Sequence, residues 1–270
     1  LPALVRNPEA YELKPDGSIV QGGYSTMVRD SYVFDAPHGG EALDLDREPQ
    51  KIDMDAHRAD LQKARYTPEQ IRSHAAYCRR TRENSDRAVM LSGPRAGLGF
   101  PTGMANWSML CLTEPEHVQE VHDLTTRHAV EQMERLLPEI KDSVDVLMLS
   151  ADDQGTQGST ILPPRLFRDL YVPYYRRVTD AVHRLAPNVK CFLHSCGAIY
   201  DLIDPVVEAG FDVLNPVQWC AGTHSYREWK DKCRGRLALW GGGVNTQATL
   251  PLGTVEDVRR EVAEVASYLA

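Results

Sequence analysis

The chain has 270 residues and a mass of 30.2 kDa, which suits one large domain or two small ones. Its hydrophobic content of 42% and charged content of 25% are ordinary for a globular protein and exclude a disordered or fibrous one. A net charge of −8 and a pI near 5.6 argue against nucleic acid or an anionic membrane as partner. No apolar run approaches the ~18 residues of a membrane span, and the mean hydropathy is −0.39, so we expect a soluble protein.

The six cysteines are spread along the chain without Cys-x-x-Cys pairs or the density of a small disulfide-rich protein. This usage indicates a reducing compartment, and we expect a cytoplasmic protein. The start of the sequence shows no pattern typical of a secretory signal.

The first 65 residues are rich in turn-forming Pro and Gly, including Pro8, Pro15, Gly22-Gly23 and Gly39-Gly40. We expect this stretch to be an irregular N-terminal segment, in which short pieces such as residues 32–34 could pair as strands. The following sequence is more regular. Thr67-Pro68-Glu69-Gln70 has the pattern of a capping box and predicts a helix that ends near residue 82.

Five short apolar runs then predict five strands, each followed by a helix. The predicted strands are residues 88–91, 144–149, 189–194, 211–215 and 236–240. Further helices are predicted from a cap at Thr113, over 164–185, over 200–209 with Gly210 as C-terminal cap, over 225–233, and from a cap at Thr254.

Continuous apolar strands are typical of a parallel sheet that is buried on both faces. Either a doubly wound sheet or a (β/α)8 TIM barrel would satisfy this pattern. No Gly-x-Gly-x-x-Gly follows the first strand, which weakens the nucleotide-binding sheet. Polar residues follow several strands in turn, as on the catalytic rim of a barrel. We therefore expect residues 1–270 to form a single barrel domain, with βα units over 88–270 and the barrel incomplete at both ends.

His194 and Cys196 form the sharpest chemical pattern. Side chains at i and i+2 of an extended chain point the same way, so both can approach one ion at the end of a strand. Imidazole and thiolate are ligands that zinc favours. The alternative is a buried histidine beside an inert cysteine, since this pair supplies only two ligands. Cys220, His224 or an aspartate could be the third, and none has diagnostic spacing.

Asp152 and Asp153 follow the second predicted strand and are candidates for a general base, a substrate contact or a metal ligand. The alternative is an Asp-rich turn. Gln218, Asn245 and Gly242 follow later strands and are candidate substrate-binding residues. The remaining histidines carry less information. His117, His122 and His128 fall on a charged helix, where we expect them to be solvated.

Four stretches together resemble the uroporphyrinogen decarboxylase superfamily, which also contains cobalamin-dependent methyltransferases. The resemblance covers about residues 88–270 and is specific only as a combination. The four stretches are 152–175, 192–197, 211–218 and 240–247. The family fold is a (β/α)8 barrel, in agreement with the pattern of predicted strands.

Within the superfamily, the chain is more similar to the methyltransferases than to the decarboxylases. The arginine-bearing N-terminal segment and the pyrrole-binding aspartate segment of true decarboxylases have no match. Methyltransferases such as methylcobamide:coenzyme M methyltransferase hold zinc with His-x-Cys and a distant C-terminal Cys. His194 and Cys196 match the first two ligands, and the third would fall beyond Ala270.

The resemblance implies a zinc-dependent transfer of a methyl group between a corrinoid, or a methoxylated substrate, and a thiol or folate acceptor. The methyl-corrinoid would be carried by a partner protein, and a homodimer would be compatible with this reading. Asp152 or Asp153 would orient substrate or accept a proton. The alternatives are uroporphyrinogen decarboxylation without a cofactor, and a non-catalytic barrel that binds a corrinoid or tetrapyrrole.

Overall fold

The computed structural model of the chain describes residues 8–21, 25–29 and 48–269. Contacts divide the chain into two compact units, which we describe separately as the N-terminal unit (Leu1–Glu48) and the C-terminal unit (Pro49–Ala270). The strand considered for residues 32–34 lies outside the described residues.

The N-terminal unit contains a small antiparallel sheet of three strands, preceded by the short 3-10 helix η1 (Pro8–Ala10). The strands are β1 (Tyr11–Leu13), β2 (Ile19–Gln21) and β3 (Ser25–Met27), in the order β1-β2-β3. Gly17, at φ +86°, forms the turn between β1 and β2, and the Asp16 carboxylate accepts a hydrogen bond from the Ser18 amide. Asp-Gly is a strong hairpin signal, so this part of the segment that we expected to be irregular is ordered.

The C-terminal unit contains a parallel sheet with its five strands in chain order, β4-β5-β6-β7-β8. The strands are β4 (Met90–Ser92), β5 (Val146–Ala151), β6 (Lys190–His194), β7 (Val213–Asn215) and β8 (Ala238–Leu239). All five were predicted from apolar runs. Sequential parallel order is that of a barrel, because a doubly wound sheet reverses direction part-way.

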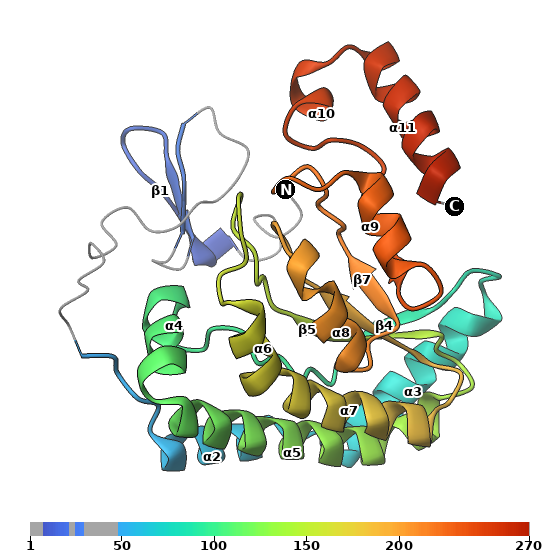
Figure 1. Cartoon of the computed structure of the whole chain (residues 1–270). Helices are drawn as coiled ribbons and strands as arrows, with labels where there is room; N and C mark the ends of the chain where they lie inside the picture. Colours follow the sequence, from blue (N-terminus) through green and yellow to red (C-terminus); the bar gives the residue numbers. More distant parts are fainter. Residues whose placement is uncertain (1–7, 22–24, 30–47, 270) are drawn as a thin grey trace. The chain divides into compact units, whose positions relative to one another are not determined.

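The helices complete the C-terminal unit (Figure 1). Their bounds are α2 (Met54–Lys63), α3 (Pro68–Glu83), α4 (Met104–Thr113), α5 (Pro115–Ile140), α6 (Pro164–Leu170), α7 (Val172–Leu185), η2 (Tyr200–Leu202), α8 (Ile203–Glu208), α9 (Tyr226–Cys233), α10 (Thr249–Leu252) and α11 (Val255–Leu269). No helix in the described part of the chain is both long and apolar enough to cross a membrane.

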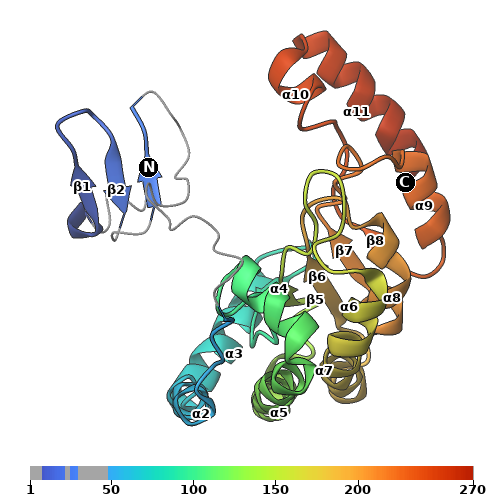
Figure 2. The ribbon, with the colours of Figure 1, turned by 60° about the vertical axis from the view of Figure 1, so that its left-hand side comes forward.

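The two faces of the sheet have different neighbours, which decides between the two fold alternatives. Leu147, Leu193 and Leu214 point into the large core that the sheet shares with α5, α7 and α8. Val146 and Phe192 point to the opposite face and form a separate small cluster with Val213 and Met148. Figure 2 shows the helices gathered along one side of the strands. One helix-covered face is the arrangement of a barrel, whereas a doubly wound sheet carries helices on both faces.

Several helix ends follow the predicted capping chemistry. The Thr67 hydroxyl accepts from the Gln70 amide at 3.2 Å, and the Gln70 side chain accepts from the Thr67 amide at 2.8 Å, which completes the capping box of α3. Gly210 ends α8 at φ +82°, as expected for a C-terminal glycine cap. The cap expected at Thr113 was wrong. Its hydroxyl donates to the Met109 carbonyl within α4, and α5 begins after Glu114 without a side-chain cap.

The helix predicted over 164–185 is two helices, α6 and α7, that meet at Tyr171. Pro173 lies in the first turn of α7, where the missing amide hydrogen costs nothing. The Tyr171 side chain is buried, accepts from the Trp107 indole at 3.0 Å and donates to the Gly99 carbonyl at 3.2 Å. The break therefore positions a buried hydroxyl that links α4 and the loop after β4.

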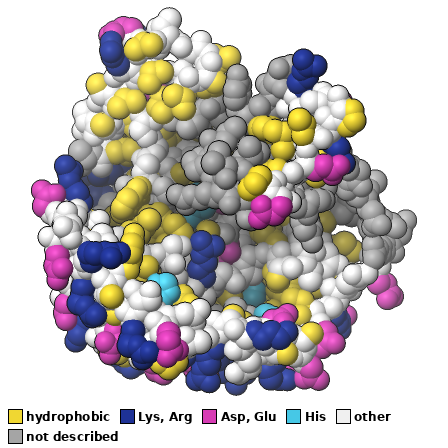
Figure 3. All heavy atoms as spheres, turned by 180° about the vertical axis from the view of Figure 1, so that it is seen from behind, with side chains coloured by type: hydrophobic (Ala, Val, Ile, Leu, Met, Phe, Trp, Pro, Cys, Tyr) yellow, Lys and Arg dark blue, Asp and Glu magenta, His cyan; other side chains and the backbone are white. Residues whose placement is uncertain are grey.

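The last two helices expose apolar side chains. Leu250, Leu252 and Val255 are 52%, 83% and 69% exposed. Figure 3 shows hydrophobic side chains gathered over α10 and α11.

His122, which we expected to be solvated, is buried against the rings of Trp107, Tyr171 and Tyr174. It falls on the apolar face of α5 and not on the charged face, so the assignment from charge pattern was wrong. Its Nδ1 lies 2.9 Å from the Leu170 carbonyl oxygen, which can only accept, so Nδ1 carries a proton and donates it. Burial lowers the pKa of His122 to about 4.

We expect His122 to make the protein less stable in mild acid. Below pH 6.5 the unfolded chain takes up a proton at this residue and the folded chain does not until about pH 4. The free energy of unfolding therefore falls with decreasing pH across this window, by about 3 kcal/mol at its lower end. Urea unfolding of the wild type and His122→Gln at pH 7, 5.5 and 4 measures the difference. Equal losses of stability in the two proteins would contradict the assignment.

Candidate active site

The candidate site lies where three neighbouring parallel strands end. In the sheet register, Ala151 of β5 pairs with His194 of β6, and His194 pairs with Asn215 of β7. Asp152 and Asp153 follow β5 directly, and Cys196 lies two residues beyond His194. Because the strands are parallel, these residues meet at one edge of the sheet.

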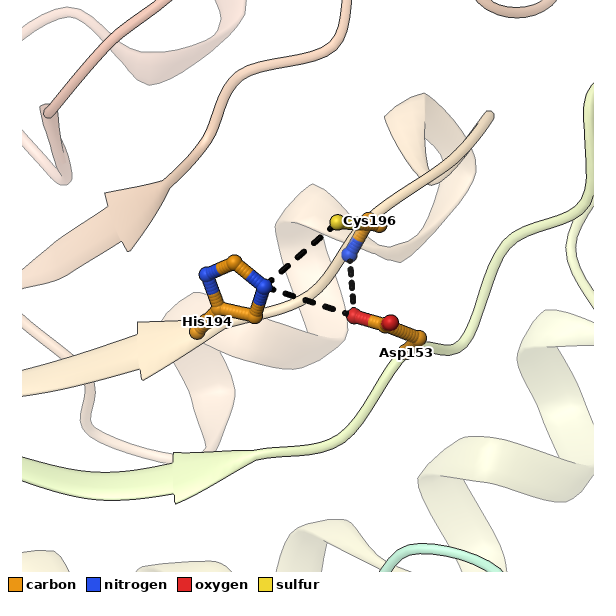
Figure 4. Close-up of side chains that lie close together, drawn as sticks. All are labelled: Asp153, His194 and Cys196. Carbon is orange, nitrogen blue, oxygen red and sulfur yellow. Dashed lines mark hydrogen bonds and ion pairs between the residues drawn. The ribbon is translucent and has the colours of Figure 1, made fainter. Parts of the chain in front are cut away.

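Asp153, His194 and Cys196 offer three ligand atoms within 4.8 Å of one another (Figure 4). His194 Nε2 lies 3.4 Å from Cys196 Sγ and 3.6 Å from Asp153 Oδ1. The Cys196 backbone amide donates to the same Asp153 oxygen at 2.8 Å. Burial and the Asp153 carboxylate raise the pKa of the Cys196 thiol to about 11, so without a cation the thiol is protonated at neutral pH.

The loops after β5 and β6 are held together by backbone contact. Gly155 donates its amide to the Cys196 carbonyl at 3.1 Å. A Cβ on Gly155 would lie 2.6 Å from the Ala198 nitrogen and 2.8 Å from the Cys196 oxygen, so no side chain fits. Gly197 faces the same contact at φ +92°. The close approach of the two glycines fixes Asp153 relative to Cys196.

The two adjacent aspartates have different surroundings. Asp152 is 8% exposed, and its Oδ2 accepts hydrogen bonds from the Ser150 and Tyr175 hydroxyls and from the Leu98 amide, the last at 3.0 Å. The Asp153 side chain is 54% exposed and faces His194. Asp152 thus secures the loop after β4, and Asp153 is presented to the site. The catalytic role considered for Asp152 stays a prediction.

The three predicted substrate-binding residues separate in the structure. Gln218 accepts from the Gly197 amide at 2.9 Å, directly beside Cys196. The Gly242 carbonyl accepts from the Trp219 indole at 2.7 Å. Asn245 accepts from the amides of residues 247 and 248, at the approach to α10. Gln218 and Gly242 therefore adjoin the site, and the Asn245 side chain shapes the following turn.

A pocket of about 320 Å³ opens beside this edge of the sheet. It is lined by residues 216–218 and 241–244 together with Cys220 and Thr246, none of which is charged. The Cys220 thiol lies 3.5 Å from the Thr246 hydroxyl. His224 is stacked on Tyr200 and bonded to Glu228. Neither belongs to the three-residue cluster at Cys196, although both were considered as a third ligand.

A second group of the same residue types lies at the opposite edge of the sheet. His183, Cys191 and Asp212 also approach within 4.8 Å of one another. The Asp212 carboxylate accepts from the Cys191 amide at 2.8 Å, lies 2.8 Å from His183 Nε2 and 3.8 Å from the Lys190 ammonium. Cys191 is fully buried, which raises its thiol pKa. With its carboxylate already beside a cation, this group is suited to holding the strand ends.

Two ligand–ligand distances in the cluster at Cys196 are close to those of a tetrahedral zinc site. Ideal zinc bonds place a thiolate sulfur and an imidazole nitrogen about 3.5 Å apart, and a nitrogen and a carboxylate oxygen about 3.3 Å apart. The observed distances are 3.4 Å and 3.6 Å. Three protein ligands would leave a fourth position open, as in catalytic zinc sites.

A family model described as uroporphyrinogen decarboxylase (URO-D) matches residues 53–268, which is most of the C-terminal unit. The chain belongs to the URO-D family. The domain of this family is a TIM barrel, in accord with the sequential strands and the helices on one face. Its members are mostly enzymes, decarboxylases or methyltransferase-like. A comparison with curated proteins gives no match.

The sequence singled out His194, Cys196 and the aspartate pair as candidates but did not separate the two aspartates. Asn215 was not among the candidate site residues, whereas the structure bonds its side chain to His194 at 2.6 Å. The available signal was its position as the last residue of a predicted strand, beside the strand that ends in His194.

Replacing each aspartate by alanine separates their roles. Asp152→Ala removes the acceptor of three buried donors, and we expect a loss of about 3 kcal/mol in the free energy of unfolding. Asp153→Ala removes one acceptor at a half-exposed position, and we expect a loss below about 1 kcal/mol. Urea unfolding of the metal-free variants measures both. Equal losses would contradict the separate roles.

The three consecutive glycines after β8 provide a second matched pair. Gly241 has φ +121°, and a Cβ there would overlap the Pro216 carbonyl, whereas a Cβ on Gly243 meets nothing within 4 Å. We expect Gly241→Ala to cost at least about 2 kcal/mol in stability and Gly243→Ala less than about 0.5 kcal/mol. Thermal or urea unfolding checks the difference, and similar costs would show that the close approach to Pro216 does not constrain this loop.

Proposed function

We propose that the chain is a zinc-dependent methyltransferase of the URO-D family, moving a methyl group between a corrinoid or methoxylated substrate and a thiol or folate acceptor. The observation that carries this proposal is the meeting of Asp153 Oδ1, His194 Nε2 and Cys196 Sγ at the ends of two adjacent strands. All six cysteines are free, in keeping with a cytoplasmic location.

In this proposal Asp153, His194 and Cys196 hold the zinc ion. Zinc, when bound, lowers the pKa of an acceptor thiol and keeps it as a thiolate. The chain's own residues supply the positions. The Asp153 carboxylate is fixed by the Cys196 amide at 2.8 Å, and the contact of Gly155 with the Cys196 carbonyl aligns the two loops.

The neighbouring pocket would receive the uncharged part of the substrate. Residues 216–218 form one wall of the pocket. The other wall includes the glycines at 241–243, where the backbone itself lines the pocket because no side chains are present. Gln218, through its bond to the Gly197 amide, ties the first wall to the Cys196 loop. The methyl-corrinoid would be presented by a partner protein at this edge of the sheet.

The lining of the pocket favours methyl transfer over decarboxylation of an acidic tetrapyrrole. A substrate with several carboxylates needs Lys or Arg near it to balance the charge. The pocket is lined by uncharged residues, and the neighbouring cluster carries the Asp153 carboxylate. A non-catalytic barrel would bind corrinoid or tetrapyrrole without turnover.

We expect the purified chain to contain one zinc ion, and Cys196→Ser or His194→Ala to lower zinc affinity by more than about 100-fold. Elemental analysis and competition with a chelating dye measure the content and the affinity. Transfer of methyl from methylcobalamin to a thiol should fall in parallel. His183→Gln, in the second His-Cys-Asp group, is the matched control and should keep the full zinc content.

Three outcomes would contradict the proposal. Zinc binding and methyl transfer that persist in Cys196→Ser would exclude Cys196 as ligand. Turnover of uroporphyrinogen by the metal-free chain would establish the decarboxylase, and tight corrinoid binding without either reaction would establish the binding protein.

A further inference from the structure

Asn215 makes two short hydrogen bonds with its side chain. Its Oδ1 lies 2.6 Å from His194 Nδ1, and its Nδ2 lies 2.7 Å from the Trp240 carbonyl oxygen. A backbone carbonyl can only accept a hydrogen bond, so the nitrogen end of the amide must face Trp240. The oxygen end therefore faces His194.

The orientation of this amide determines the tautomer of His194. An amide oxygen only accepts, so His194 Nδ1 must carry the proton that it receives. In a neutral imidazole the other nitrogen, Nε2, then has a free lone pair. That lone pair is on the side of the ring that faces Cys196 Sγ at 3.4 Å and Asp153 Oδ1 at 3.6 Å.

We propose that Asn215 is a positioning residue that fixes His194 in the Nδ1–H tautomer and so presents the Nε2 lone pair to a metal ion. The role of this tautomer in metal binding rests on the proposed function. The tautomer itself is a property of the metal-free chain and can be tested there. A histidine ligand in a metal site commonly donates its second nitrogen in this way.

The backbone around Asn215 holds the amide in place. The Ser195 amide donates to the Asn215 carbonyl at 2.8 Å, and the Trp240 amide donates to the Leu214 carbonyl at 2.9 Å. Val217 has φ +62°, a conformation that costs a β-branched residue free energy. A Cβ on Gly242 would lie 2.9 Å from the Val217 carbonyl oxygen. The loops after β7 and β8 are therefore in close contact at Val217, which holds its backbone in this conformation.

The contacts with His194 and with the Trp240 carbonyl together require a side-chain amide at the distance from the backbone that asparagine gives. Aspartate could accept from His194 Nδ1, but its second oxygen would face the Trp240 carbonyl. Alanine makes neither bond. Without the acceptor at Nδ1, the Nε2–H tautomer of His194 becomes the more stable one, because the Asp153 carboxylate can accept a hydrogen bond from Nε2. The structure thus predicts that removal of the Asn215 side chain moves the proton to the nitrogen that must bind metal.

Long-range proton–nitrogen NMR on protein labelled with 15N-histidine tests the tautomer directly. The full metal-free chain should show a protonated Nδ1 and a bare Nε2 at His194, assigned by comparison with His194→Gln. Asn215→Ala should show the proton on Nε2, and Asn215→Asp should restore it to Nδ1. In zinc titrations, Asn215→Ala should bind 10- to 100-fold more weakly than Asn215→Asp.

The alternatives give different results. A merely structural Asn215 would lower stability in both variants and leave the tautomer of Asn215→Ala unchanged, which would overturn the proposal. A neutral His194 with its proton on Nε2 and a bare Nδ1 in the wild type would overturn it without any variant. If the wild type shows the expected tautomer but binds no zinc, the positioning role stands and the proposed function fails.

Discussion

The parallel register of β5, β6 and β7 is the constraint on which the candidate site depends. It places Ala151, His194 and Asn215 in one row across three strands. Because side chains alternate along a strand, a shift of one residue in β6 would turn His194 toward the helices and Phe192 away from its cluster with Val213. The apolar packing on the two faces of the sheet therefore also fixes the position of the polar ligands at its edge.

Environment, more than residue type, distinguishes the two His-Cys-Asp groups. At the end of β6, Asp153 is half exposed and its thiol neighbour Cys196 is partly accessible. At the start of the same strand, Cys191 is fully buried and Asp212 lies beside Lys190. A cation already present lowers the attraction for a second one. The same three residue types thus occur at both ends of β6. They are more accessible at the end of the strand and form a partly buried hydrogen-bond network at its start.

The fold was predictable mainly where local chemistry determines it. The five apolar runs became strands, the predicted capping box at Thr67 begins α3, and the helix predicted over 225–233 is α9. The errors have both local and distant causes. The hydroxyl of Tyr171, at the break between α6 and α7, is held by Trp107 and Gly99, 64 and 72 residues away, which no local pattern encodes. The β1–β2 hairpin at Asp16-Gly17 and the helices α2, α4 and α10 were not predicted, although the hairpin and the Asp53 cap of α2 are local features.

The sequence predicted which side chains meet at the candidate site but not which groups they bond to. The spacing of His194 and Cys196 along the chain predicted that both approach one point at the end of a strand, and the structure brings them together. Asp153 could not be told from Asp152, because what separates them is which loop lies over each carboxylate. The Leu98 amide, in the loop after β4, donates a hydrogen bond to the Asp152 carboxylate, whereas Asp153 faces the candidate site. Such a contact joins residues 54 positions apart, and no local pattern encodes it.

The charges of the three donors explain why a thiol of raised pKa is suited to this site. The Asp153 carboxylate carries one negative charge, and an imidazole that binds a metal ion carries none. A second negative charge on Cys196, next to Asp153 and partly buried, is unfavourable, which is why burial and Asp153 raise the pKa of the thiol to about 11. A divalent cation reverses this balance, because one carboxylate and one thiolate neutralise it. The loaded site would then carry no net charge, which matches the uncharged lining of the adjoining pocket. A metal-free Cys196 is by contrast a neutral thiol, and the Asp153 charge that disfavours its thiolate would attract a cation to the same place.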